Sequence, residues 1–205
     1  MRQLVALAWL LVLTGCSLIP ATQPAKADFD FGPLTAQAPY LANSSEEGVV
    51  VEEITAPPFM DNSSMYYRLA YRSAANPMPY ARSEWVMSPA ALLTQRLRSR
   101  LASGDDEVRR AGEAVYALRS ELVEFDQIFD EPYRSRGVLR LRATLEGDGV
   151  WMQRTFAIEK AAPTADAPGG VKALTQCTEE LAALASEWVA ASRSRLRDAS
   201  ARLEP

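Results

Sequence analysis

The sequence predicts an α+β fold, in which one mixed, largely antiparallel sheet of about six strands packs against two main helices. Apolar and polar residues alternate over 139–145 and again over 150–158, the period of half-buried strands. A stripe of apolar residues at helical spacing covers 171–188 and indicates a long amphipathic helix. A second helix is predicted to begin at Ser88-Pro89, because serine is a preferred N-cap and proline a preferred first helical residue.

The chain of 205 residues begins with a segment typical of an export signal. Arg2 precedes an uncharged apolar run over 4–13, which is shorter than the about 20 residues that cross a bilayer. The following Leu13-Thr14-Gly15-Cys16 resembles the lipobox of bacterial lipoproteins, in which a peptidase cuts before the cysteine. We therefore expect a lipoprotein signal peptide over 1–15 and diacylglyceryl and N-acyl groups, such as palmitate, on Cys16. The alternative is an ordinary secretory signal with a cysteine near its end.

Acylation of Cys16 would anchor the protein to a membrane, because two acyl chains give stable anchoring where one does not. Residues 16–27 then comprise the lipidated cysteine and a flexible tether, since they are small, polar and contain proline. By resemblance to sorted lipoproteins, Ser17 after the cysteine favours the outer membrane of a Gram-negative bacterium. The predicted location is thus lipid-anchored at the outer membrane, facing the periplasm.

The domain itself is predicted over 28–195 and begins with strands. Short strands are expected at 28–34, 48–55 and 64–71. The Asn-Pro-Met-Pro stretch over 76–79 predicts a turn, and 80–86 predicts a short extended piece. The helix from Ser88 should end near Ser103-Gly104, since glycine commonly follows the last helical residue.

Residues 107–126 are ambiguous from their pattern. Val108, Ala111, Val115, Leu118 and Leu122 have helical spacing, so periodicity favours a helix, although the same stretch also suits a bulged strand. Farther along, Glu146-Gly147-Asp148-Gly149 predicts the turn of a hairpin between the two alternating strands. Residues 161–170 predict a linker, and the charged tail over 196–205 is expected to fray.

The composition excludes several chemistries. The sequence has no histidine, which rules out a Ser-His-Asp triad, a Cys-His pair and histidine-ligated zinc. Its formal charge of −4 argues against binding of nucleic acid, which requires a basic face. Phosphate-loop and serine-nucleophile motifs are missing too, so we expect no enzyme, no metal and no cofactor. Cys177 lies in the apolar stripe of the last helix and is expected to be a buried small residue.

Two groups of side chains are candidates for binding. Tyr66, Tyr67, Tyr80 and Trp85 form a dense aromatic cluster of residue types that are enriched at interfaces, although core packing is the alternative. The second group is a row of arginines at even positions in and before the predicted strand over 139–145, which would share its outward face: Arg134, Arg136, Arg140 and Arg142. Such a strip would suit an acidic partner or a phospholipid headgroup, and the alternative is a solvated face paired with glutamates.

Several short motifs, taken in order, resemble a known family. The stretch Ala-Pro-Pro-Phe-Met-Asp over 56–61 leads into Met-Tyr-Tyr-Arg over 65–68, then Tyr80 and Trp85, then Pro89 with its leucine-rich helix. Together with the lipobox, this order resembles the ABC-type transport auxiliary lipoprotein family over 28–192. The resemblance implies a mixed sheet with two helices, and a strand over 115–125 in place of the helix that periodicity favours.

The resemblance also implies a function. Family members act with an ABC ATPase, a permease and an MCE-domain protein that move lipids between the inner and outer membranes, and they have no catalytic residues. We therefore expect a non-enzymatic component that docks the MCE assembly at the outer membrane, with phospholipid and a homo-oligomer left open as further partners. Two alternatives remain: a structural or assembly lipoprotein of another envelope complex, and a periplasmic lipid-binding carrier.

Overall fold

A computed structural model describes residues 25–33, 48–101, 116–147 and 149–200. The predicted signal peptide, the predicted lipidation site Cys16, the helix end predicted near 103–104 and residues 107–115 lie outside these ranges. The elements in chain order are β1 Ala27–Phe29, β2 Val49–Val51, β3 Ser64–Leu69, β4 Ser73–Trp85, α2 Pro89–Leu101, β5 Tyr116–Glu131, β6 Arg134–Gly147, β7 Val150–Ala161 and α3 Ala167–Ser200.

The strands form one seven-stranded mixed sheet with the order β1-β4-β3-β5-β6-β7, and the short β2 also pairs with β5. The hairpins β3–β4, β5–β6 and β6–β7 are antiparallel, whereas β2 and β3 both run parallel to β5 along its other edge. The predicted α+β class is therefore confirmed, with one strand more than the six expected.

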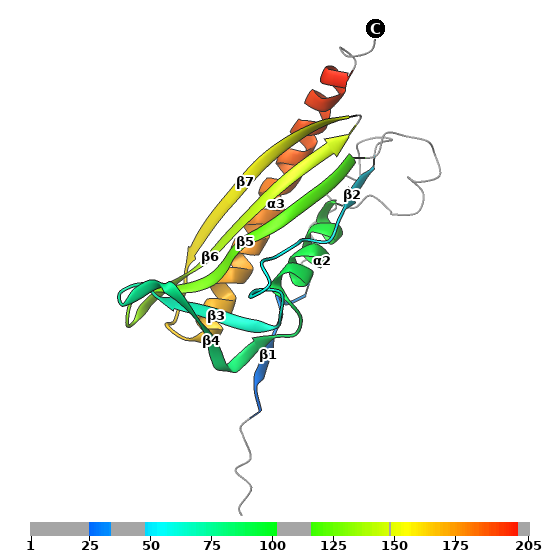
Figure 1. The fold of residues 1–205 in the computed structure, drawn as a ribbon. Coiled ribbons are helices and arrows are strands. Elements are labelled where there is room, and N and C mark those ends of the chain that lie inside the picture. The colour runs from blue at the N-terminus through cyan, green and yellow to red at the C-terminus, as the bar shows by residue number, and fades with distance from the viewer. Residues whose placement is uncertain (1–24, 34–47, 102–115, 148, 201–205) are drawn as a thin grey trace, which may run out of the picture.

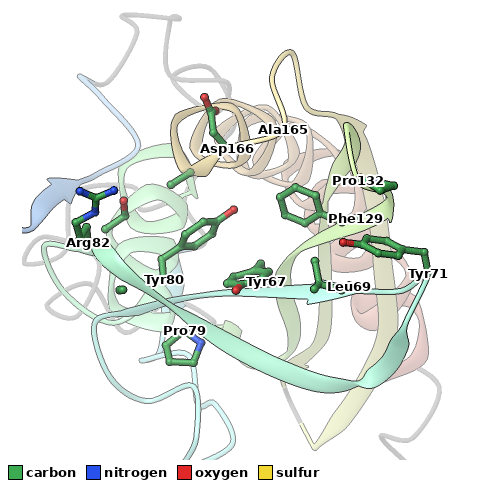
Figure 2. Close-up of a pocket in the computed structure, with 13 residues that line it drawn as sticks. Tyr67, Leu69, Tyr71, Pro79, Tyr80, Arg82, Phe129, Pro132, Ala165 and Asp166 are labelled. Atoms are coloured by element: carbon green, nitrogen blue, oxygen red, sulfur yellow. The ribbon is translucent and has the colours of Figure 1, made fainter.

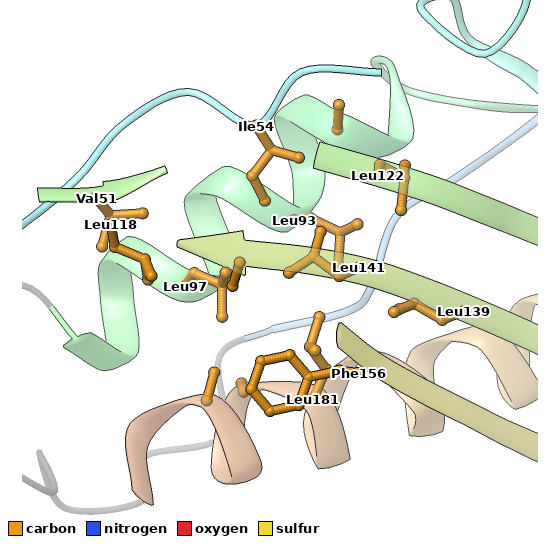
Figure 3. Close-up of a cluster of buried hydrophobic side chains, with 14 of the residues drawn as sticks. Val51, Ile54, Leu93, Leu97, Leu118, Leu122, Leu139, Leu141, Phe156 and Leu181 are labelled. Carbon is orange, nitrogen blue, oxygen red and sulfur yellow. The ribbon is translucent and has the colours of Figure 1, made fainter. Parts of the chain in front are cut away.

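Both helices cover the same face of the sheet (Figure 1). The core lies between them and the long strands, where Leu93 and Leu97 of α2 meet Leu141 of β6 and Leu181 of α3 (Figure 3). These side chains are at most 1 % exposed. Burying a leucine contributes about 1.5–3 kcal/mol, so this layer of leucines stabilises the contact between the sheet and the helices. Within the described residues, no helix is long and apolar enough to span a membrane.

Residues 116–131 form a strand, β5, as the family resemblance implies, and the helical interpretation of their periodicity is wrong. The reason is a bulge between Leu122 and Glu124 in the pairing with β6. Inward residues occupy even positions up to Leu122 and odd positions from Phe125 onwards. The step from Leu122 to Phe125 therefore has a spacing of three, which imitates a helical face although the backbone is extended.

Two further predictions need correction. The turn expected at 76–79 is wrong, because these residues lie inside β4 and the chain reverses instead at Ala70–Arg72. Pro77 and Pro79 are tolerated there because this part of β4 pairs only with β3, and an edge strand can accept residues without an N–H donor. The final helix extends to Ser200, so residues 196–200 do not fray. Leu196 continues the buried stripe and is 3 % exposed.

The strands expected at 28–34 and 48–55 are shorter than predicted, and α3 begins inside the predicted linker over 161–170. Three predicted details agree with the structure. The Ser88 hydroxyl accepts a hydrogen bond of 3.4 Å from the Ala91 amide, as expected of an N-cap. Gly149 has φ of 76° in the turn between β6 and β7, a conformation that favours glycine. Cys177 is fully buried near the carbonyl oxygen of Gly137, at 3.5 Å, and burial raises the pKa of its thiol to about 12.

Candidate functional site

A groove of about 610 Å³ lies between the β3–β4 hairpin, the end of β5 and the start of α3 (Figure 2). Most of its lining is aromatic or apolar, with Arg82 and Asp166 as the charged residues. Its lining residues are Tyr67, Leu69, Tyr71, Pro79, Tyr80, Ala81, Arg82, Ser83, Phe129, Pro132, Ala165, Asp166 and Ala167. The groove is open to solvent and is not an enclosed cavity.

Three aromatic rings form the floor of this groove. The ring of Tyr67 lies 4.6 Å from that of Tyr80 and 5.8 Å from that of Phe129, the latter in an edge-to-face arrangement. Both separations are within the range in which aromatic pairs attract each other. Figure 2 shows Tyr67 between the other two rings. The cluster therefore gives the groove a stiff apolar floor built from three different strands.

A buried glutamine holds this floor in place. Gln127 is fully buried on β5, and its Oε1 accepts a hydrogen bond of 2.8 Å from the Tyr80 hydroxyl. Its Nε2 donates to the Ser135 hydroxyl at 2.8 Å and to the Asp166 carbonyl at 3.1 Å. One side chain thus joins β4, β5, β6 and the start of α3, and every hydrogen-bonding atom of its amide is satisfied.

The start of α3 forms the upper wall of the groove. The Asp166 carboxylate accepts hydrogen bonds from the Thr164 hydroxyl at 2.6 Å and from the Gly169 amide at 2.9 Å, as an N-cap does. These bonds lower the pKa of Asp166, which stays ionised at neutral pH. Burial, together with the nearby Tyr67 and Asp166, raises the pKa of Tyr80, so its hydroxyl stays protonated and remains a donor to Gln127.

The aromatic residues singled out from the sequence do not form one cluster. Tyr67 and Tyr80 lie together in the groove. Tyr66, on the same strand as Tyr67 but on its other face, packs against Phe59 with the ring centroids 6.0 Å apart. Trp85 is 2 % exposed and belongs to the core, in contact with Phe31 and Phe125. For Trp85 the core-packing alternative therefore holds.

Arg140 and Arg142 lie on β6, next to the groove strand β5, and their side chains are exposed on the face of the sheet that the helices leave uncovered. Arg140 pairs with Glu124 at 3.4 Å and Arg142 with Glu121 at 2.6 Å, both on the adjacent β5. Arg136 on the same face contacts both Asp130 and Glu159. The row is therefore one of alternating charges and not a basic strip, which matches the solvated and paired alternative.

Some groove residues carried no sequence signal. Phe129 follows the bulge in β5, where the alternation had already changed phase. Gln127 is polar within an extended stretch, and nothing in its neighbours distinguishes it from a solvent-facing residue. Asp166 lies in the predicted linker, although Asp with glycine three residues later could have indicated a helix start earlier than 171. Over the described residues, no cluster of cysteine, aspartate and glutamate could hold a metal ion.

The sequence and the fold of this chain resemble those of known proteins. A family model described as "ABC-type transport auxiliary lipoprotein component" matches residues 33–185. The chain belongs to this family. The family is one of transport components associated with an ABC system at the cell envelope. No curated protein matches the sequence.

Two solved structures share the fold of this auxiliary lipoprotein. The crystal structure of an uncharacterized protein matches with a TM-score of 0.60 at 16 % identity, over 80 % of this chain and 99 % of that one. The crystal structure of protein XCC0632 from Xanthomonas campestris, assigned to DUF330, matches with a TM-score of 0.58 at 14 % identity, over 80 % of this chain and 89 % of that one. At these identities the likeness concerns the fold alone.

Proposed function

We propose that this auxiliary lipoprotein is the lipid-anchored, periplasm-facing component of an MCE-type transport system that moves lipids between the inner and outer membranes. The observation that carries the proposal is the family match over 33–185, which assigns the chain to ABC transport auxiliary lipoproteins. Acylation of Cys16 at the sequence Leu-Thr-Gly-Cys would anchor the protein at the outer membrane. Its role there is to dock the MCE-domain protein, without catalysis.

We place the docking contact in the aromatic groove. Tyrosine, phenylalanine and arginine are enriched at the cores of protein interfaces, and Tyr67, Phe129 and Arg82 line the groove together. The floor is held by the Gln127 hydrogen bonds, so little side-chain freedom is lost when a partner binds. The occupant would be apolar side chains at the outer-membrane end of the MCE-domain protein, with a carboxylate positioned against Arg82.

The alternative of a lipid-binding carrier has weaker support. The groove is open to solvent, so an acyl chain lying in it would keep part of its apolar surface in water. A protein partner that covers the groove from outside would bury the same rings more completely. Native mass spectrometry of the purified lipoprotein tests the carrier directly, because a carrier should retain bound phospholipid.

Affinity purification of the full chain in mild detergent tests the docking function. We expect an MCE-domain protein and an ABC ATPase to co-purify with it. Tyr67→Ala should lower the recovered MCE-domain protein by roughly tenfold or more, the loss typical of an interface hot spot. Tyr66→Ala, which changes the neighbouring tyrosine on the other face of β3, is the matched control and should leave recovery unchanged. A preparation of the unaltered chain that contains no MCE-domain protein would refute the proposal.

A further inference from the structure

Two tyrosines outside the floor of the groove are strongly exposed, and each lies in a hairpin turn. Tyr71, in the turn between β3 and β4, is 41 % exposed, and Tyr133, in the turn between β5 and β6, is 93 % exposed. A tyrosine in a turn with this much exposure contributes little to the core. Exposed apolar side chains indicate a contact surface when they lie together on the molecule. The question is therefore whether these two turns are neighbours.

The topology of the sheet brings the two turns together. Strand β3 runs parallel to β5, with Leu69 opposite Phe129, so both strands end at the same edge of the sheet. A backbone hydrogen bond of 2.9 Å from Ala70 to Phe129 joins the start of one turn to the end of β5. Figure 2 shows Tyr71 next to Pro132, which belongs to the other turn. The two tyrosines therefore lie on one continuous edge.

This edge also carries two exposed arginines, Arg72 and Arg134. The guanidinium of Arg72 lies 5.7 Å from the centre of the Tyr71 ring, and it forms no ion pair with any described residue. Arg134 follows Tyr133 and pairs with Glu131 at 2.5 Å, and Arg136 is shared between Asp130 and Glu159. Among these described residues, Arg72 is therefore the cation that the ion pairs leave available to an anionic partner. Tyrosine is enriched where hydrocarbon meets headgroups, and arginine near a membrane is attracted to anionic lipids. The chemistry of the edge thus fits an anionic phospholipid surface.

The position of the chain start points to the same occupant. Strand β1 begins at the end of the molecule that also carries the two turns, and the C-terminal end of α3 lies at the opposite end (Figure 1). Residues 17–26 separate Cys16 from β1. Ten residues span at most about 35 Å when fully extended. A chain anchored at Cys16 would therefore keep this edge within reach of the bilayer.

We propose that the aromatic turn pair, Tyr71 and Arg72 with Tyr133 and Arg134, rests on the anionic phospholipid surface of the membrane that holds the anchor. This inference depends on the lipid anchor of the proposed function. The anchor supplies the attachment, so even a weak contact at the turns is strengthened by a high effective concentration of lipid. The contact fixes the orientation of the domain and sets the aromatic groove beside the bilayer.

Site-specific quenching tests the contact. The full lipidated chain with Tyr133→Cys carries a fluorophore and is reconstituted into vesicles of phosphatidylethanolamine and phosphatidylglycerol that contain brominated acyl chains. Cys177 is fully buried and does not compete for the label. Trp151→Cys is the matched control, because Trp151 is also exposed, at 66 %, and lies near the other end of β6. The 14 residues of β6 place it about 45 Å away at 3.3 Å per residue.

We expect the lipid to quench the label at residue 133 at least about twofold more strongly than the label at residue 151. The additional change Tyr71→Ser should reduce this difference, and so should vesicles of phosphatidylcholine alone, which lack anionic headgroups. Equal quenching of the two labels in protein that floats with the vesicles would overturn the contact and leave the anchor intact. Protein that fails to float would overturn the anchor and the contact together.

Discussion

Replacing Tyr80 by phenylalanine removes one hydroxyl from the network beneath the groove and leaves the ring in place. The hydroxyl donates at 2.8 Å to Gln127 Oε1, whose amide nitrogen is already engaged by Ser135 and by the Asp166 carbonyl. Gln127 is fully buried, so Oε1 would lose its hydrogen-bond partner in a site with little access to water. A buried acceptor left unpaired costs about 1–3 kcal/mol. Because Tyr80 itself is only half-buried, we expect the lower part of this range, about 1–2 kcal/mol.

Urea denaturation followed by circular dichroism measures this loss in the free energy of unfolding. For a chain of this size it corresponds to a fall in Tm of roughly 2–8 °C. Tyr67→Phe is the matched control, because the Tyr67 ring is 4.6 Å from that of Tyr80 while its hydroxyl forms no hydrogen bond to any described residue. That change should cost less than about 0.5 kcal/mol. Equal stabilities for the two variants would show that the Gln127 network does not support the groove.

Three further predictions concern the same region and the core. Gly170→Ala would place a Cβ 2.0 Å from Gln127 Oε1, so thermal melts should show a loss of about 1–3 kcal/mol, and an unchanged melt would contradict the close packing. Asp166→Ala should cost about 0.5–2 kcal/mol at pH 7 through loss of the N-cap. The pKa of Asp166 is lowered by folding, so its contribution is present above about pH 4 and lost as the pH falls further, and melts of both proteins should converge there. Cys177, with its pKa raised to about 12, should resist maleimide at neutral pH and react only in urea; rapid labelling of the folded protein would disprove its burial.

The sequence predicted secondary structure best where the alternation of apolar and polar residues continues through a whole element. Strand β6 alternates without interruption through Leu139, Leu141, Ala143 and Leu145, and the turn at Gly149 has the positive φ that its composition indicated. Strand β5 was harder because its single bulge changes the phase of the alternation, and an extended chain then shows a helical spacing. For these residues, only the family resemblance predicted a strand in place of a helix.

The groove was predictable only in part. Tyr67 and Tyr80 were predicted as interface candidates from their residue type. Residue type alone could not distinguish them from Trp85, which lies in the core. What separates them is strand pairing between residues about 60 positions apart, such as Tyr67 opposite Gln127. A pattern within one short window cannot reveal such a pairing, because it depends on which strands become neighbours in the sheet.

The pairing of β2 and β3 with one edge of β5 also bears on the order of folding. Strands β5, β6 and β7 follow one another through tight turns, and α3 follows β7 and packs on them, so the sequence separations across these contacts are shorter. The contacts of β2 and β3 with β5 each close a loop of about 60 residues, at a higher cost in chain entropy. Loop closure therefore favours a C-terminal half that assembles first and then serves as the template on which the N-terminal strands complete the sheet.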